Sequence, residues 1–245
     1  MKILKLWHEK LHLPTRRIRN VLLAVIAANV SLGHGQDVFT KAREQMVQEQ
    51  IIARDVNDTA TLRAMRKVPR HQFVPPGQIE NAYGDFPLPI GEGQTISQPY
   101  IVALMTELAK PRKGQRILEV GTGSGYQAAV LAEIVDSVFT IEIVPELARS
   151  AGDRLRRLGY RNILVRLGDG YLGWPEHAPF DAILVTAAAE HVPQPLVDQL
   201  KDGGLMVIPV GEVWAIQTLM LLRKQGKKIV SEEKIPVRFV PLIHK

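Results

Sequence analysis

Residues 116–126 constrain the fold more than any other part of this 245-residue chain. An apolar run from Arg116 to Val120 predicts a buried strand, which leads into Gly121, Gly123 and Gly125 before a helical pattern begins. In a parallel α/β sheet, such a unit brings backbone N–H groups close to a nucleotide. A dinucleotide fingerprint needs G-x-G-x-x-G, but Tyr126 stands where its third glycine would fall. The spacing therefore disfavours a dinucleotide site, and a tight turn without a ligand is the structural alternative.

The spacing E-x-G-x-G-x-G, which begins at Glu119, instead resembles the S-adenosylmethionine loop of Rossmann-like methyltransferases. Two further sequence features that fit this cofactor lie at the ends of later predicted strands, where ligands of such sheets bind. Glu142 comes 21 residues after Gly121, where an acid would accept the two ribose hydroxyls, and Asp169 with Gly170 follows the next strand, where Asp169 can accept from an adenine amino group. A solvated acid and an ordinary Asp-Gly turn are the alternatives. Together these three features predict S-adenosylmethionine as the cofactor.

Strands and helices alternate from residue 116 onward, as an open parallel sheet requires. Strands are expected at 116–120, 138–142, 162–167, 180–185 and 205–209, with helices at 128–134, 145–158 and 195–200. Residues 215–223 and 228–235 predict a terminal antiparallel hairpin. The predicted fold class is α/β: a Rossmann-like, mostly parallel doubly wound sheet.

The part of the chain before this sheet is expected to form helices and a long loop. Residues 39–67 have a helical pattern, with Asp58 or Thr59 as cap of a second helix near Ala60, and another helix is expected at 100–108. Residues 83–93 are rich in glycine and proline, so we expect no regular secondary structure there. We expect one methyltransferase domain at 36–245, with 36–113 as its helical and loop substrate region, preceded by an extension at 1–35.

The net charge of +6 is concentrated at the N-terminus. Residues 1–20 carry six basic side chains and one acidic side chain, so the remaining 225 residues carry a net charge of only +1. A basic face for nucleic acid is therefore not expected. The chain has no cysteine, which excludes disulfides, thiolate metal sites and cysteine nucleophiles. We identify no pattern of metal-ligating residues in the sequence, and a monomer is expected.

Residues 1–35 have the order of a secretory signal: basic residues, an apolar run at 21–28, then small residues. The apolar run is too short to predict a membrane span. An uncleaved extension on a cytoplasmic enzyme is the alternative. We favour the cytoplasm, because an exported enzyme would lack an obvious supply of S-adenosylmethionine.

The loop before the sheet indicates the acceptor. A Pro-Pro-Tyr or Pro-Pro-Phe after the fourth strand would favour a nitrogen acceptor, but residues 187–189 are alanines. An ionised carboxylate is already nucleophilic and needs alignment and desolvation rather than a general base. The hydroxyls of Thr95 and Ser97 suit such an acceptor. The alternative is that Ser97 only caps the following helix, ahead of Pro99.

Residues 83–99, Y-G-D-F-P-L-P-I-G-E-G-Q-T-I-S-Q-P, resemble the signature loop of the protein-L-isoaspartate O-methyltransferase family. The resemblance continues through 119–126, 168–170, 181–189, 192–196 and 239–242, and covers about residues 40–245. It implies methyl transfer from S-adenosylmethionine to the free α-carboxylate of L-isoaspartyl residues in damaged proteins and peptides. The ester then collapses to a succinimide without the enzyme, and hydrolysis returns some normal aspartate.

The resemblance also assigns roles. It implies that Ser97 is the active-site hydroxyl, and that the substrate is bound by Asp85, Thr95, Ile96, Val240 and Pro241. It implies that the cofactor is bound by Glu119, Gly121, Gly123, Gly125, Glu142, Asp169 and Gly170. The family often has tyrosine where this chain has Phe239, a departure we expect to be without effect.

Two other functions remain open at this point. A methyltransferase for a small-molecule acid would need a closed apolar pocket, whereas the polar, glycine-rich residues 83–99 favour an open groove. An S-adenosylmethionine-binding protein without catalysis, such as a sensor or assembly partner, would not need Ser97 and Asp85. His71 and His191 are interpreted as structural, because the reaction needs no proton transfer.

Overall fold

The computed structural model describes residues 38–213 and 215–244. The expectation for the extension at 1–35 lies outside these residues. The chain divides into two units, residues 1–42 and 43–245, and the account below concerns the second. Among the described residues, no helix has both the length and the apolar character that crossing a membrane requires.

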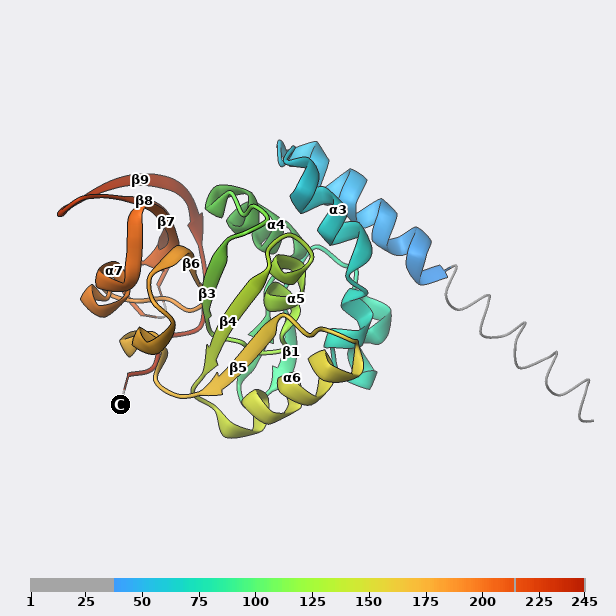
Figure 1. Cartoon of the computed structure of the whole chain (residues 1–245). Helices are drawn as coiled ribbons and strands as arrows, with labels where there is room; N and C mark the ends of the chain where they lie inside the picture. The colour runs from blue at the N-terminus through green and yellow to red at the C-terminus, as the bar shows by residue number, and fades with distance from the viewer. Residues whose placement is uncertain (1–37, 214, 245) are drawn as a thin grey trace, which may run out of the picture. The chain divides into compact units, whose positions relative to one another are not determined.

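A seven-stranded sheet forms the centre of the second unit, in the order β5-β4-β3-β6-β7-β8-β9 (Figure 1). The strands from β5 to β7 are parallel to their neighbours, whereas β7, β8 and β9 pair antiparallel. The predicted fold class is therefore confirmed. The strands are β3 (Arg116–Val120), β4 (Ser137–Glu142), β5 (Ile163–Leu167), β6 (Phe180–Val185), β7 (Leu200–Val210), β8 (Gln217–Gln225) and β9 (Lys228–Val237).

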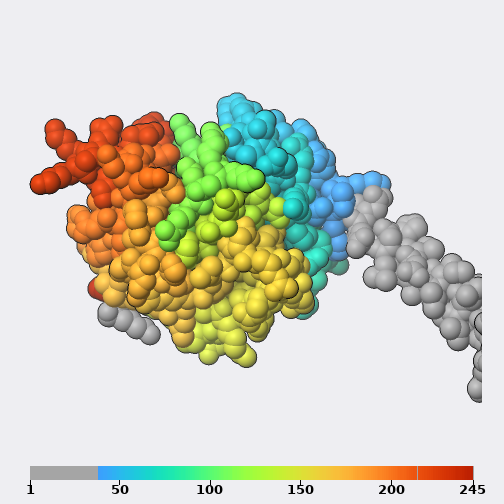
Figure 2. All heavy atoms as spheres, viewed as in Figure 1, coloured from blue at the N-terminus to red at the C-terminus, as the bar shows by residue number. Residues whose placement is uncertain are grey.

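The chain runs outward from β3 to β5 and then returns to place β6 beside β3 on its other side. This reversal of strand order creates a crevice at the carboxyl ends of β3 and β6, the usual ligand position in open α/β sheets. The last two strands form the predicted hairpin, which turns at Gly226. The tip of this hairpin projects from the body of the unit in the space-filling view (Figure 2).

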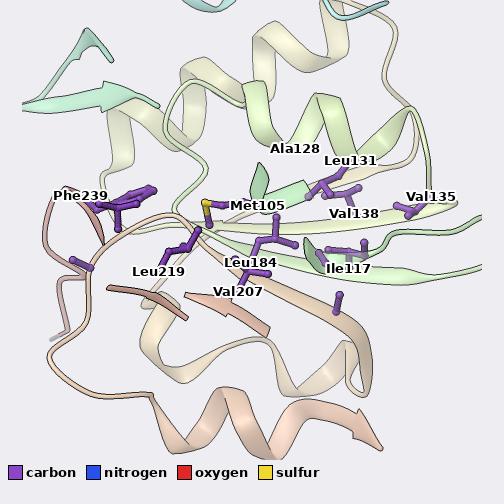
Figure 3. Packing of buried hydrophobic residues seen from close by; sticks show 14 residues of the cluster. Met105, Ile117, Ala128, Leu131, Val135, Val138, Leu184, Val207, Leu219 and Phe239 are labelled. Atoms are coloured by element: carbon purple, nitrogen blue, oxygen red, sulfur yellow. The ribbon is translucent and has the colours of Figure 1, made fainter. Parts of the chain in front are cut away.

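Alternate strand residues face opposite sides of the sheet, and each side has its own core. Ile117, Leu184 and Val207 pack with Met105 of α4 (Pro99–Ala109) and Leu131 of α5 (Tyr126–Ala132) on one side (Figure 3). The other side packs the remaining strand residues with α7 (Gln194–Gln199). A further helix, α6 (Pro145–Arg157), connects β4 to β5. The apolar runs of the sequence thus form strands whose residues are buried on both faces of the sheet.

The region before the sheet is mostly helical. It contains η1 (Met46–Ile51), η2 (Ile52–Arg54), α3 (Thr59–Lys67), η3 (Arg70–Phe73) and η4 (Pro76–Asn81). Asp58 caps α3, because its side chain accepts from the Thr61 backbone N–H at 2.8 Å. This confirms the predicted cap, and the helix begins one residue earlier than expected.

One expectation about this region is wrong. Residues 83–93 were expected to lack regular structure, but β1 (Leu88–Gly91) and β2 (Gln94–Ile96) form an antiparallel hairpin. Its two turn residues, Glu92 and Gly93, both have positive φ, 52° and 69°. Such a two-residue turn matches the twist of the strands, which allows a short pair to form despite the prolines.

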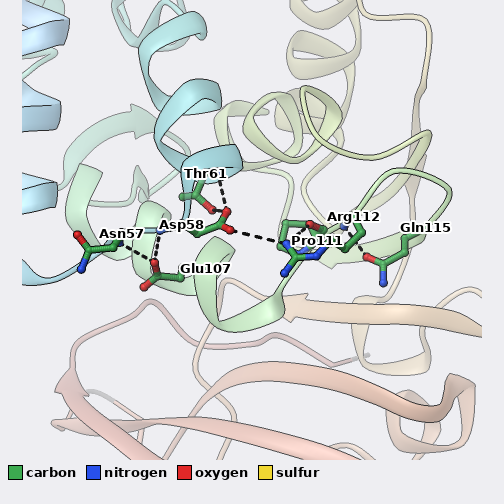
Figure 4. Close-up of polar contacts among 7 residues, drawn as sticks. All are labelled: Asn57, Asp58, Thr61, Glu107, Pro111, Arg112 and Gln115. Carbon is green, nitrogen blue, oxygen red and sulfur yellow. Dashed lines mark hydrogen bonds and ion pairs between the residues drawn. The ribbon is translucent and has the colours of Figure 1, made fainter.

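Polar contacts join α3 to α4 (Figure 4). A carboxylate oxygen of Glu107, on α4, accepts from the backbone N–H groups of Asn57 at 2.7 Å and Asp58 at 2.6 Å. Arg112, beyond the end of α4, approaches the other oxygen of Asp58 at 3.7 Å. The helical region is therefore attached to the C-terminal part of α4, the helix that follows residues 94–97.

Candidate functional site

The loop between β3 and α5 exposes bare backbone at the crevice. Gly121, Gly123 and Gly125 have φ of 99°, 51° and 85°, in the region that L side chains rarely adopt. A Cβ on Gly121 would lie 2.5 Å from the Thr186 hydroxyl oxygen. Both conformation and space therefore require glycine at position 121, as the spacing in the sequence indicated.

A cavity, here called the inner cavity, lies at the carboxyl ends of β3, β4 and β6. It is lined by residues 94–97, 119–124, 141–144, 186–187 and 240–243, together with Val102, Tyr126, Gln127 and Gly170. The structure thus brings ten of the thirteen predicted site residues into one wall: Thr95, Ile96, Ser97, Glu119, Gly121, Gly123, Glu142, Gly170, Val240 and Pro241. It leaves Asp85, Gly125 and Asp169 outside the lining.

Glu142 is fixed by backbone groups on both sides. One carboxylate oxygen accepts from the Gly123 N–H at 2.7 Å, and the other accepts from the Val144 N–H at 3.0 Å. The side chain is only 6% exposed, so the alternative of a solvated acid is wrong. Because a carboxylate oxygen can accept more than one hydrogen bond, the oriented group can still receive a pair of hydroxyls from a ligand.

Glu119 has an unusual environment at the base of the inner cavity. It is completely buried, and neither carboxylate oxygen has a hydrogen-bond partner among the described residues. Burial, together with the nearby Glu142 carboxylate, raises the pKa of Glu119 to about 8. A buried carboxyl without partners, in the wall of a cavity, suits a ligand that brings its own positive charge.

Asp169 and Gly170 differ in their relation to the inner cavity. Gly170 lines it, and a Cβ there would lie 2.4 Å from a methyl carbon of Val120. Asp169 instead caps the short helix η5 (Gly170–Leu172), accepting from the Tyr171 N–H at 3.0 Å. Its other oxygen lies 2.6 Å from Nδ1 of His244. Sequence reasoning missed His244, since only the folded chain brings it 75 positions back to Asp169.

A second depression, here called the outer groove, adjoins the inner cavity and has a volume of about 680 Å³. It is lined by Pro87, Thr95, Ser97, Gln98, Ile101, Thr186, Ile216 and residues 236–240. Thr95, Ser97, Thr186 and Val240 line both spaces. The predicted catalytic hydroxyl therefore stands where the two spaces meet.

Ser97 does not cap the helix that follows it. The N-cap of α4 is Gln98, and no side chain makes a capping bond there. The alternative that Ser97 serves only as a cap is therefore wrong. Its place at the junction of the two spaces is the remaining local explanation for a serine at this position.

Asp85 lies outside both spaces, and its contacts hold the loop at residues 83–99 in position. It forms a salt bridge with Arg54, and its backbone oxygen accepts from the Gln98 side chain at 3.0 Å. The Arg54 guanidinium also lies 4.5 Å from the centre of the Tyr100 ring. The sequence analysis did not single out Arg54. No local pattern points to it, because its partner Asp85 is 31 positions away.

The two histidines that the sequence singled out lie outside both spaces. Nδ1 of His71 is 2.8 Å from the Tyr83 hydroxyl, and burial lowers the pKa of His71. Nε2 of His191 is 3.4 Å from the Tyr171 hydroxyl. Their positions agree with the structural roles expected for them.

The features above fit S-adenosylmethionine: bare glycine backbone, an oriented acid at the end of β4, and a buried carboxyl without partners. Together with the sheet order, they define the class of S-adenosylmethionine-dependent methyltransferases. The family model for protein-L-isoaspartate(D-aspartate) O-methyltransferase matches residues 41–245. The chain belongs to this family.

Individual relatives agree with this assignment. The protein-L-isoaspartate O-methyltransferase of Opitutus terrae is 59% identical over 227 residues, which are 92% of this chain and 97% of that protein. That of Picosynechococcus sp. is 60% identical over 206 residues, 84% of this chain and 92% of its own.

Solved structures give the same result. A protein-L-isoaspartate O-methyltransferase structure has a TM-score of 0.75 and 31% identity, over 81% of this chain and 65% of its own. A Plasmodium falciparum protein described as a protein-L-isoaspartate O-methyltransferase, in complex with S-adenosyl-L-homocysteine, has a TM-score of 0.71 and 27% identity, over 82% of this chain and 98% of its own.

Proposed function

We propose that this enzyme methylates the free α-carboxylate of L-isoaspartyl residues, with the donor in the inner cavity and the acceptor peptide in the outer groove. The observation that carries the proposal is that Thr95, Ser97, Thr186 and Val240 line both spaces. The two spaces are therefore adjacent, which supports a reaction between a methyl group bound in one and a carboxylate bound in the other. The methyl ester formed on the damaged residue begins its repair.

The donor is S-adenosylmethionine, and we assign the parts of the inner cavity to it in order along the sheet edge. Glu142 accepts the two ribose hydroxyls, with its carboxylate already oriented by Gly123 and Val144. The glycine loop approaches the methionine part, near the buried Glu119. Gly170 and the adjacent Asp169 lie toward the adenine.

Alignment is the main contribution of the protein to the reaction. When bound, the cofactor would supply a methyl group on a sulfonium: an oxygen nucleophile would attack the methyl carbon in line, and the neutral thioether would leave as the C–S bond breaks. The Ser97 hydroxyl donates a hydrogen bond to one oxygen of the acceptor carboxylate, which leaves the other oxygen directed at the methyl group. The carboxylate is ionised at neutral pH and needs no base, so the positions of His71 and His191 outside the site are consistent with this chemistry.

The outer groove favours a peptide over a small-molecule acid. It extends along residues 236–240, which comprise the end of β9 and the three residues after it, and its rim includes the exposed Ile216. A peptide lying along this segment can bond to the backbone of Val240 and Pro241. A groove of about 680 Å³ has room for side chains next to the damaged residue.

The compartment and assembly are part of the same proposal. We place the enzyme in the cytoplasm, where S-adenosylmethionine is made, as a monomer that does not act on nucleic acid. We also propose residues 36–245 as the catalytic domain. Mass spectrometry of the N-terminus in the native host tests this location: an intact extension supports the cytoplasm, and cleavage near residue 35 supports export.

Transfer of labelled methyl from S-adenosylmethionine to a synthetic isoaspartyl peptide tests the activity, with the normal aspartyl peptide as control. We expect label only in the isoaspartyl peptide, released as methanol in mild base. No labelling of either peptide, while the cofactor still binds, would contradict the proposed acceptor.

Ser97→Ala tests the catalytic assignment. It should lower kcat at least about tenfold, roughly 1.4 kcal/mol of transition-state stabilisation. Ser231→Ala, at an exposed position on β9, is the matched control and should leave kcat unchanged. Equal kcat values for the two variants would remove Ser97 from the mechanism.

A further inference from the structure

Residues 240–244, here called the C-terminal strap, cross the edge of the sheet where the inner cavity opens. At one end the strap is bonded beside β6: the Ala188 N–H donates to the Val240 oxygen at 2.8 Å, and the Leu242 N–H donates to the Ala188 oxygen at 2.7 Å. At the other end His244 reaches Asp169, beyond β5.

The middle of the strap forms part of the cavity wall. Leu242 and Ile243 both line the inner cavity, between the two attachments. A ligand bound there is therefore in contact with apolar side chains of the strap, of which Leu242 also packs against the hydrophobic core.

His244 makes two specific contacts at the distal attachment. Its Nδ1 lies 2.6 Å from a carboxylate oxygen of Asp169, and its ring stacks on Tyr171 with 4.3 Å between centroids and 24° between planes. Asp169 is itself held by the Tyr171 N–H. Although His244 is close to the end of the chain and half-exposed, it is fixed from two directions.

We propose that His244 latches the C-terminal strap over the cofactor cavity and thereby slows release of S-adenosylmethionine and of the product S-adenosylhomocysteine. The inference rests on the cofactor position proposed above. His244 is a positioning residue: it acts through Leu242 and Ile243, not on the reacting atoms. The attachment at Ala188 uses backbone groups and survives any substitution of His244, so the distal contact can be removed by itself.

Dissociation of S-adenosylhomocysteine from the full chain, measured by stopped-flow displacement, tests the latch. His244→Ala should raise the dissociation rate about tenfold, the expected effect of losing a hydrogen bond to a charged group, and should change the association rate little. His244→Phe keeps a ring for stacking without the donor, and should fall between the two. His191→Ala, which touches Tyr171 from another side, is the control and should match the parent chain.

Amide hydrogen exchange of Leu242 in the cofactor-free protein gives a second measurement. His244→Ala should speed this exchange, because the Leu242–Ala188 bond then lies in a strap attached at one end only. If S-adenosylhomocysteine fails to bind even the parent chain, the proposed cofactor site is wrong, while the exchange measurement still tests the strap. Unchanged exchange and dissociation would overturn the latch. So would tighter binding by His244→Ala, which would show that His244 competes with the ligand.

Discussion

The glycine loop at 121–125 and the substrate loop at 82–99 are held in different ways. The glycine loop takes its shape from positive φ angles at its glycines and from backbone bonds, in which the Gly121 N–H donates to the Ile141 oxygen at 2.9 Å and the Gly125 N–H to the Thr122 oxygen at 2.7 Å. The side chains of Thr186 and Arg154 add bonds to the oxygens of Gly121 and Ser124, at 2.8 Å each. The substrate loop is held by side chains that donate to its carbonyl oxygens. These donors are Gln50 to Tyr83 at 2.8 Å, Arg70 to Ala82 at 2.8 Å and Gln98 to Asp85 at 3.0 Å.

The two loops therefore depend on different kinds of residue. The glycine loop depends on a backbone conformation with positive φ, so its critical positions are glycines. The substrate loop depends on the side chains that reach its carbonyl oxygens, and two of these, Gln50 and Arg70, lie outside the loop. Cofactor binding should therefore be sensitive within residues 121–125, and substrate binding should be sensitive at residues that touch no substrate.

Arg70 connects the two loops. It is completely buried, its Nε donates to the substrate loop, and its guanidinium lies 5.0 Å from the centre of the Tyr126 ring, directly after the glycine loop. Burial lowers the pKa of Arg70 to about 10, so the side chain remains charged at neutral pH. Its two terminal nitrogens have no hydrogen-bond partner among the described residues. The charge is offset mainly by the ring and by the carbonyl of Ala82.

The largest effect is expected at Gly121. Gly121→Ala forces a side chain into a backbone conformation with φ of 99° and to within 2.5 Å of the Thr186 hydroxyl. Affinity for S-adenosylmethionine, measured by isothermal titration calorimetry, should fall at least about a hundredfold, or roughly 2.7 kcal/mol. Gly77→Ala is the control, because nothing lies within 4 Å of its added Cβ. Normal affinity in Gly121→Ala would contradict a backbone-built cofactor loop.

The next effect concerns Arg54, which holds the substrate loop through Asp85. Arg54→Met keeps the apolar stem and removes the charge. We expect kcat/KM for an isoaspartyl peptide to fall roughly tenfold, with the affinity for S-adenosylmethionine within about twofold. Arg63→Met, at an exposed position on α3, should change neither value. Parallel losses of peptide activity and cofactor affinity would show that the two loops are not independently held.

Glu119 gives the enzyme a pH dependence of stability. Its folded pKa of about 8 lies above the ordinary value of 4.5, so between these values the folded state keeps a proton that the unfolded state loses. Stability should therefore fall as pH rises from about 4.5 to 8. Glu119→Gln is neutral throughout and removes this decline.

Thermal unfolding of the cofactor-free protein at pH 5 and pH 8 measures the effect of Glu119. The Tm of Glu119→Gln should exceed that of the parent chain by about 5 °C or more at pH 8, and by little at pH 5. Glu80→Gln, an exposed site, should show no such difference. A gap of equal size at both pH values would show that ionisation of Glu119 is not its cause.

The smallest effect is expected at the cap of α3, on the substrate side. Asp58→Ala removes the acceptor for the Thr61 N–H and should cost about 1 kcal/mol of stability, or about 2–4 °C in Tm. Asp58→Asn keeps an acceptor oxygen at the cap and should recover most of the loss. If the two variants unfold at the same temperature, the contact of Asp58 with Arg112 matters more than the cap.

Much of the cofactor side could be predicted from the sequence, because its signals are local. The strand at 116–120 was predicted with the bounds that the structure gives to β3. The requirement for glycine at 121 follows from spacing alone. By contrast, the hairpin at Leu88–Gly91 and Gln94–Ile96 was not expected, because its prolines and glycines conceal a pairing that a two-residue turn makes possible.

The sequence by itself determined the fold class, the family and the residue types at the ends of the strands, since apolar periodicity and glycine spacing act over a few neighbouring residues. Only the tertiary structure decided that Ser97 stands between two spaces, that Arg54 holds Asp85, and that His244 returns to Asp169. These contacts join residues distant in the chain. Their geometry is set by the order of strands in the sheet and by how each loop packs, neither of which leaves a local pattern.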